Sequence, residues 1–218
     1  RGVEKELQRA LELDPGSVDA WRDYAYWFFI PMRRLDEALE AQKKAVELDP
    51  LSPMLRHVLG YTYWLLGKAD CAIEQYQSAL ELDPRFFFAH IHRGLALISL
   101  NRIDEGIGAV EMGVQLSGRT ARSLEFLGFV YAKAGRTDEA RATLEELMRL
   151  AQKQYVPPSS IGVIYSALGE FEQGIDWLEK ACDEHYVGVA QTSMDPMLDP
   201  LRSHPRYRAL LRKMNLEA

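Results

Sequence analysis

Apolar side chains return every three or four positions along most of the chain, which is the spacing of amphipathic helices. In 1–14 the apolar face is formed by Leu7, Ala10 and Leu11. Five longer segments with the same spacing follow, each interrupted once by a short polar stretch. The pattern predicts a lone helix over 1–14 and then five helix pairs, at 17–30 and 34–48, 52–66 and 69–82, 86–100 and 103–117, 120–134 and 137–152, and 158–168 and 171–185.

Small residues return along these helices with a period of 34. One column holds Ala25, Gly60, Gly94, Gly128 and Gly162, and a second holds Ala38, Ala72, Gly106, Ala140 and Gly174. We expect both columns where two antiparallel helices cross closely, because a larger side chain would hold them apart. The columns lie 12 positions apart except in the first repeat, where the gap of 13 predicts a one-residue insertion near Pro31.

The ends of the predicted helices carry matching stop signals. Leu-Asp-Pro at 13–15, 48–50 and 82–84 ends second helices, because proline cannot continue a helix. Gly67, Asn101, Gly135 and Gly169 follow first helices, where a left-handed residue caps the end.

This pattern resembles the tetratricopeptide repeat (TPR) family, whose 34-residue unit is a pair of helices. The resemblance is carried by Leu59-Gly60-Tyr63, Leu127-Gly128-Tyr131 and Ile161-Gly162-Tyr165, with Ala72 and Tyr76 in a second helix. It implies an all-α fold, a right-handed α-solenoid of antiparallel helix pairs (a TPR superhelix) with a C-terminal capping helix. We expect the second helix of a partial repeat in 1–15, five pairs in 16–185 (about 16–50, 51–84, 85–118, 119–154 and 155–185), and an extended lead and capping helix in 186–218.

The capping helix is predicted to begin near Ser203, after a lead over 186–201 that contains two Asp-Pro turns. Repeat arrays need an end cap with a polar outer face. Here that face would be supplied by Arg206, Arg208, Arg212 and Lys213.

Composition narrows the classes of partner. The 218 residues contain 26 Lys and Arg against 32 Asp and Glu, a formal charge of −6, which disfavours nucleic acid. The longest apolar stretch, 24–32, is too short to span a bilayer, so we expect no membrane insertion. Cys71 and Cys182 are expected to be reduced thiols, which favours the cytoplasm and leaves an extracytoplasmic location open.

Catalytic and metal-binding motifs are not found. His90 and His92 are two positions apart and so face different sides of a helix, which argues against a metal site. His57, His185 and His204 are interpreted as surface or capping groups. We expect no enzyme activity and no cofactor.

The family resemblance implies that the first helices line a concave groove that holds a protein or peptide. The matching positions of the first three pairs are Arg22, Tyr26, Phe29, His57, Tyr61, Trp64, Ile91, Leu95 and Ile98. The fourth and fifth pairs offer Glu125, Phe129, Lys133, Ser159, Val163 and Ser166, so the groove is expected to become more polar toward the C-terminus. Tyr26, Tyr61 and Trp64 are expected to be exposed there, whereas Phe29 and Leu95 could equally pack in the core. Of the three aromatics at 86–88, at least one is expected to point outward or into the preceding turn.

The Lys and Asn clamp with which some family members hold a C-terminal carboxylate is missing. We therefore expect an apolar or amphipathic peptide, bounded by Arg22 and His57. The alternative is a regulatory self-association segment, in which the chain itself or a second copy (a homodimer) fills the groove. The tail from Asp195 to Leu211, with 169–181 before it, resembles C-terminal TPR arrays of bacterial multidomain regulators that carry a kinase, winged-helix or cyclase domain. That resemblance implies a sensory or scaffolding part of a larger protein.

Overall fold

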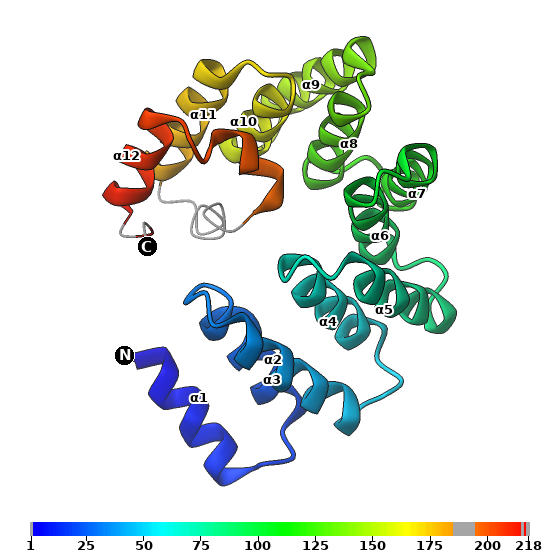
Figure 1. The fold of residues 1–218 in the computed structure, drawn as a ribbon, viewed down its shortest axis with the longest axis vertical. Coiled ribbons are helices and arrows are strands. Elements are labelled where there is room, and N and C mark those ends of the chain that lie inside the picture. The colour runs from blue at the N-terminus through cyan, green and yellow to red at the C-terminus, as the bar shows by residue number, and fades with distance from the viewer. Residues whose placement is uncertain (1, 185–194, 215, 217–218) are drawn as a thin grey trace.

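The computed structural model describes residues 2–184, 195–214 and 216, and these form helices stacked into an open arc (Figure 1). The first half holds α1 (Gly2–Leu13), α2 (Val18–Asp23), η1 (Tyr24–Phe29), α3 (Leu35–Leu48), α4 (Pro53–Leu65), α5 (Ala69–Leu82), α6 (Phe87–Ser99) and α7 (Ile103–Leu116). The second half holds α8 (Ala121–Lys133), α9 (Thr137–Ala151), α10 (Pro158–Ala167), α11 (Phe171–Asp183), η3 (Pro196–Leu201) and α12 (Pro205–Lys213). The predicted all-α solenoid with a capping helix is confirmed. None of the described helices is long and apolar enough to cross a membrane.

The two helices of a pair touch through the columns of small residues. A Cβ atom added to Gly94 of α6 would lie 2.6 Å from the backbone oxygen of Gly106 in α7. In return, a Cβ added to Gly106 would lie 2.9 Å from the backbone oxygen of Gly94. Because backbone faces backbone at this crossing, neither helix can carry a side chain there.

Each first helix ends in the same left-handed turn. Gly67 has φ of 71°, and the next residue, Lys68, donates its backbone N–H to the Tyr63 carbonyl at 2.9 Å. Arg33 and Asn101 hold the same place in other pairs with φ of 60° and 59°. This turn sends the second helix back antiparallel to the first.

The extra residue of the first repeat lies in η1, a π-helix, and not at Pro31. Its wider turn is visible where the Ile30 N–H reaches back five residues to the Ala25 carbonyl at 3.0 Å. A π-turn absorbs one inserted residue without ending the helix. The insertion was therefore predicted in the correct repeat, but it lies a few residues before the predicted position.

The lead to the cap differs from the prediction where it is described. Its part 186–194 lies outside the described residues. The rest is η3, a 3₁₀-helix, because the Asp195 side chain accepts the Met197 N–H at 2.9 Å and Pro196 suits a first turn. Met197, Leu198 and Leu201 are buried, and η3 contacts α10 on the inner side of the arc (Figure 1).

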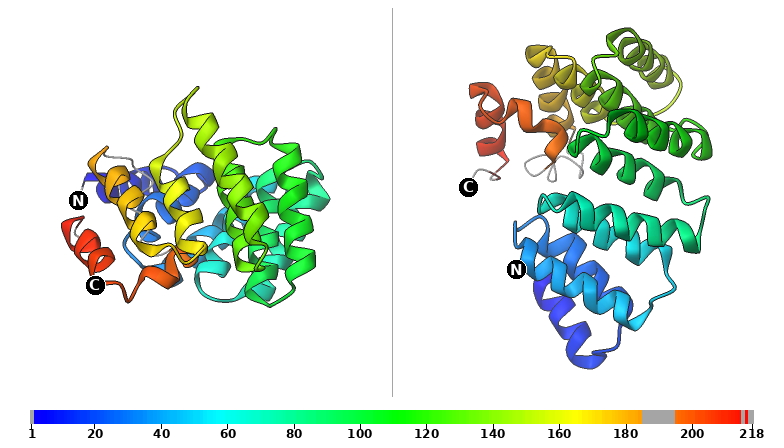
Figure 2. Two further views of the ribbon diagram at one scale, coloured as in Figure 1. Left: turned by 90° about the horizontal axis from the view of Figure 1, so that it is seen from above. Right: turned by 45° about the vertical axis from the view of Figure 1, so that its right-hand side comes forward.

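The capping helix α12 packs on α11 at the C-terminal end of the arc, whereas α1, α2 and α3 form its N-terminal end (Figure 2). The Tyr207 side chain of α12 is fully buried. Arg206 was predicted to lie on the outer face of the cap, but its side chain turns toward α11. There its guanidinium pairs with three carboxylates, those of Glu172 at 2.6 Å, Asp176 at 2.8 Å and Glu179 at 2.9 Å.

Candidate partner-binding site

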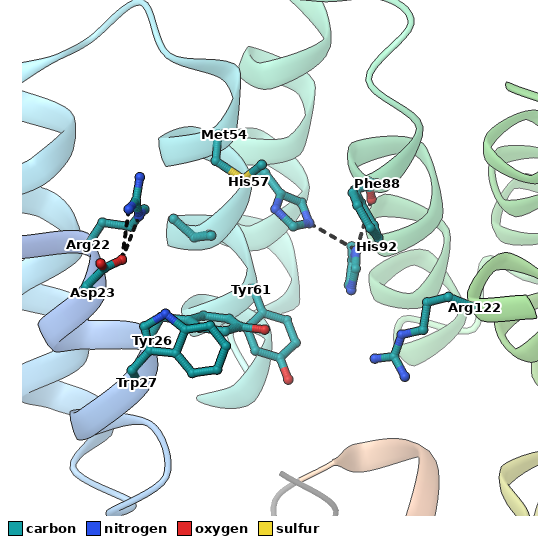
Figure 3. Close-up of a pocket in the computed structure, with 11 residues that line it drawn as sticks. Arg22, Asp23, Tyr26, Trp27, Met54, His57, Tyr61, Phe88, His92 and Arg122 are labelled. Atoms are coloured by element: carbon teal, nitrogen blue, oxygen red, sulfur yellow. Dashed lines mark hydrogen bonds and ion pairs between the residues drawn. The ribbon is translucent and has the colours of Figure 1, made fainter. Parts of the chain in front are cut away.

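A cavity of about 460 Å³ opens on the inner side of the arc, in its N-terminal half (Figure 3). Its walls come from α2 and η1 on one side, α4 and α6 in the middle, and the start of α8 on the other. The lining residues are Arg22, Asp23, Tyr26, Trp27, Met54, His57, Val58, Tyr61, Phe88, His92 and Arg122.

Aromatic rings form the wall at the N-terminal side. Tyr26 meets Trp27 edge to face at 5.0 Å between ring centroids, and its ring lies 6.4 Å from that of Tyr61. Trp27 is 56% exposed and Met54 43% exposed. Large apolar side chains gathered around an open cavity are typical of surfaces that bind another molecule.

The π-helix explains why two aromatic rings of η1 reach this wall. Counted back from Tyr61, Trp27 is 34 positions away and Tyr26 is 35 positions away. The regular repeat step therefore assigns Trp27 to the place of Tyr61, whereas the register before the insertion assigns Tyr26. With one extra residue in the turn, both side chains project to the same cavity (Figure 3).

Two histidines from successive repeats meet at the base of the cavity. The His57 Nε2 and His92 Nδ1 atoms are 3.0 Å apart, and His92 Nδ1 is also 2.9 Å from the Phe88 carbonyl oxygen. Burial lowers the pKa of His92 to about 4 and holds the pKa of His57 well below its usual value. Both rings are therefore neutral at neutral pH.

The charged groups at the edges of the cavity are already paired. Arg22 binds Asp19 at 2.7 Å and Asp23 at 2.9 Å. Arg122 binds the buried Glu125 at 3.0 Å and lies over the Phe126 ring. In the described part of the chain, no three His, Cys, Asp or Glu side chains gather to hold a metal ion. The arrangement suits an apolar ligand with few polar contacts.

The C-terminal half of the same concave face is covered. Of the six inner positions predicted there, Lys133 is exposed, and the other five are buried: Glu125, Phe129, Ser159, Val163 and Ser166. Here η3 contacts α10, and its own apolar side chains join the same core cluster as those of α8 and α10. Ser166 packs against α11, where a Cβ added to Gly174 would meet its hydroxyl oxygen, and η3 packs on α10. The serines of α10 therefore do not form the expected polar groove.

Burial also affects the acid at the start of η3. It raises the pKa of Asp195 to about 6, although the Met197 N–H and the nearby charge of Arg122 favour the ionised form. Glu125 lies in the same region and accepts the Ser160 hydroxyl at 2.5 Å. Both acids lie near Arg122, which also lines the open cavity.

Of the residues predicted to line the groove, the structure brings Arg22, Tyr26, His57 and Tyr61 together around the cavity. His57 is not the surface or capping group that was expected, because its ring packs against His92 and is 8% exposed. Ile91 and Ile98 face α7 instead, since they fill the space left by Gly113 and Gly106.

The other two predicted residues pack inside the array. The Phe29 ring stacks on Tyr24 with 4.2 Å between ring centroids, so Phe29 packs in the core, one of the two placements expected for it. Trp64 was expected to be exposed, and that was wrong: it is 6% exposed and donates its Nε1–H to the Ser99 hydroxyl at 3.2 Å.

The prediction missed Asp23, Trp27, Met54, Val58, Phe88, His92 and Arg122. A signal existed for some of them. Met54 is three positions before His57 and seven before Tyr61, so it shares their face. Phe88 and His92 are likewise four apart. Trp27 lies 34 positions before Tyr61, so the repeat step points to it, but the spacing does not show that the π-turn brings both Tyr26 and Trp27 to the cavity.

The fold is that of a helical-repeat solenoid, and the inner side of its arc carries an open cavity. Tetratricopeptide repeat models match residues 4–53, 29–85 and 57–119, and further models of the same description match 121–146 and 160–184. Since these matches cover more than half of the chain, it belongs to the tetratricopeptide repeat family, and it is a protein-interaction module of that kind. A search of curated proteins found no match to the sequence.

Solved structures share the fold. A thermophilic TPR protein of Thermus thermophilus, TTC0263, has a TM-score of 0.65 at 19% identity, covering 84% of this chain and 99% of its own. The TPR protein YrrB, described as having an unusual peptide-binding site, has a TM-score of 0.52 at 19% identity over 84% and 95%. A crystal structure of MamA has a TM-score of 0.55 at 24% identity over 67% and 85%.

Proposed function

We propose that the cavity between η1, α4 and α6 binds an apolar side chain of a partner peptide or helix. One observation carries the proposal: Trp27 and Met54 are exposed at the rim of a cavity whose wall continues with Tyr26 and Tyr61. Exposing apolar surface in water is unfavourable, by about 25 cal/mol for each Å² left uncovered. A partner side chain that covers these groups gains that free energy on binding.

The comparison with YrrB supports a peptide as the ligand, because its description names a peptide-binding site on the same fold. The partner differs from a peptide held by its carboxylate, since Arg22 and Arg122 already bind acids of their own helices. In a larger bacterial protein this segment would act as a sensory or scaffolding part, bringing the partner to the other domains.

Self-association is the second candidate, and the covered half of the groove favours one form of it. There η3 of the same chain packs on α10, a first helix of the array. Sedimentation of the purified chain with and without Tyr61→Ala tests whether a second copy fills the open half. If the wild-type chain forms a dimer and Tyr61→Ala dissociates it, self-association replaces peptide binding as the proposed function.

A peptide-display library tests the binding of a partner. We expect wild-type protein to select peptides with a shared aromatic or long aliphatic residue, and Met54→Ala to weaken the selected peptides about tenfold. Met112→Ala is the matched control, because Met112 is exposed to a similar extent (46%) but lies outside the cavity. The proposal is wrong if no peptide is selected, or if folded Met54→Ala and Tyr61→Ala proteins bind as the wild type does.

A further inference from the structure

One buried polar atom at the cavity has no partner. His57 is 8% exposed and lines the cavity, yet its Nδ1 has no hydrogen-bond partner among the residues that the structure describes. Buried polar groups are nearly always hydrogen-bonded, because an unpaired one loses its interaction with water and gains nothing in return. Since His57 lines an open cavity, a ligand seated there is the candidate that supplies the missing bond.

The neighbouring hydrogen bonds decide whether this atom donates or accepts. The Phe88 carbonyl can only accept, so the 2.9 Å contact from His92 Nδ1 requires a proton on that nitrogen. A protonated Nδ1 cannot accept from His57, so His57 Nε2 must be the acceptor in their 3.0 Å contact. Because the His57 ring is neutral, its single proton is then on Nδ1. The cavity therefore presents an N–H donor.

The charges around the cavity define the acceptor that this donor would meet. Arg22 and Arg122 are paired with carboxylates, so they offer little net attraction to another anion. Asp23 also lines the cavity and disfavours a second carboxylate. A neutral oxygen fits better, and every peptide residue brings one in its backbone carbonyl.

We propose that His57 Nδ1–H donates to the backbone carbonyl of the partner residue whose side chain fills the aromatic cavity. The inference rests on the proposed function and specifies its ligand: an extended peptide segment with an aromatic or long aliphatic residue and a carbonyl free to accept. His92 is a positioning residue, since it acts by holding His57 in the tautomer that donates.

Two substitutions separate the two ring nitrogens of His57. In His57→Asn the amide nitrogen takes the place of Nδ1, so a donor remains although the contact with His92 is lost. In His57→Gln the amide takes the place of Nε2, so the contact with His92 remains although the donor is lost. With a peptide selected by the wild-type protein, we expect His57→Asn to keep its Kd within about threefold and His57→Gln to raise it about tenfold.

A change in the peptide gives the complementary measurement. Replacing the carbonyl of the anchoring residue by a methylene group removes the proposed acceptor and keeps the side chain. We expect this peptide to lose about tenfold in affinity for the wild type and almost nothing further for His57→Gln. Equal losses with both proteins would overturn the proposal, and so would a larger effect of His57→Asn than of His57→Gln.

The tautomer can be observed without a ligand. Nitrogen-15 NMR of the free protein should show His57 protonated at Nδ1, and the Nδ1 signal should shift when the peptide binds. A proton on Nε2 would contradict the inference. The other unpaired buried group nearby is the Tyr76 hydroxyl, which does not line the cavity. If Tyr76→Phe shifts the Nδ1 signal as much as the peptide does, a water shared with Tyr76 satisfies His57 and the proposal fails.

These results also separate the inference from the proposed function. If no peptide binds the wild type, the proposed function fails with it. If peptides bind and Met54→Ala weakens them, but the two His57 variants and the methylene peptide change nothing, only the role of His57 is wrong.

Discussion

The two halves of the concave face are built from the same repeat but differ in what covers them. In the N-terminal half, Trp27 is 56% exposed beside an open cavity. In the C-terminal half, Ser159, Val163 and Ser166 of α10 are buried, and η3 contacts that helix. One half is closed by its own chain, and the other is left with aromatic side chains in contact with solvent.

The side chains explain the difference. On α10, the small residues Gly162 and Ser166 pack against α11, and η3, whose Leu201 side chain is fully buried, contacts the same helix. In the N-terminal half, large rings on η1 and α4 line the open cavity. The serines at the inner positions of α10 are therefore buried in helix packing and do not line a hydrophilic groove.

The largest expected effect comes from comparing a side chain of each half. Leu201→Ala removes a fully buried side chain from η3 and should lower the free energy of unfolding by about 2–5 kcal/mol. Trp27→Ala, at an exposed ring of the open half, should change it by less than about 1 kcal/mol. Urea unfolding followed by circular dichroism measures both. Similar losses would mean that the halves are packed alike.

The second prediction concerns pH. The folded-state pKa of His92, about 4, lies below its ordinary value of 6.5, so the folded protein resists protonation of this ring. The contribution of this pKa difference to the free energy of unfolding is therefore fully present above pH 6.5 and is lost as the pH falls toward 4. Between pH 7 and pH 5 the loss should be roughly 2 kcal/mol, with His57 adding to it in the same direction.

Asp195, at the edge of the closed half, acts in the opposite direction. Its pKa is raised from 3.8 to about 6, so the folded protein gains stability as the pH falls through 6. This gain should offset roughly 1 kcal/mol of the histidine loss at pH 5. Asp195→Asn should therefore be more sensitive to pH than the wild type, and His92→Gln less so. Urea titrations at pH 7 and pH 5 that show no difference between these proteins would contradict the assignment.

Much of the fold could be predicted because the 34-residue period repeats the same packing requirement five times. Gly94 and Gly106 mark a helix crossing in the sequence as clearly as in the structure. The segment η3 could not be predicted in this way, since its turn signals at Asp195-Pro196 are local. They do not say which surface Met197 and Leu201 will cover.

The candidate site was predicted only in part for a related reason. Helix periodicity places Tyr61 and His57 on an inner face, but it does not decide which neighbour each side chain meets. Trp64 shares that face and yet turns to Ser99 of the next first helix. Trp27 and Tyr26 both reach the cavity because the inserted residue widens one helical turn. The spacing of the small columns predicts the insertion, but it does not show that a π-turn absorbs it.

The third prediction tests the crossing that joins the two halves, between α6 and α7. Gly94→Ala puts a methyl group 2.5 Å from Val110 Cγ2 and 2.6 Å from the Gly106 backbone oxygen, so it should destabilise the protein by about 1–3 kcal/mol. Gly108→Ala in α7 is the matched control, because nothing lies within 4 Å of its added Cβ. The better helix propensity of alanine should make that variant more stable by up to about 1 kcal/mol. A stable Gly94→Ala protein would mean that the crossing is looser than the structure has it.

The smallest expected effect is a gain of stability in the open half. Gln42 of α3 is fully buried, and neither polar atom of its side chain has a hydrogen-bond partner among the described residues. Its repeat counterparts Leu144 and Leu178 are apolar and also buried. Gln42→Leu removes two unsatisfied groups at nearly constant volume, so it should raise the free energy of unfolding by about 1 kcal/mol. Gln77→Leu, at an exposed position of α5, should change it by less than about 0.5 kcal/mol. If Gln42→Leu instead lowers the melting temperature, the Gln42 amide has a partner that matters, and the N-terminal half is packed as completely as the C-terminal half.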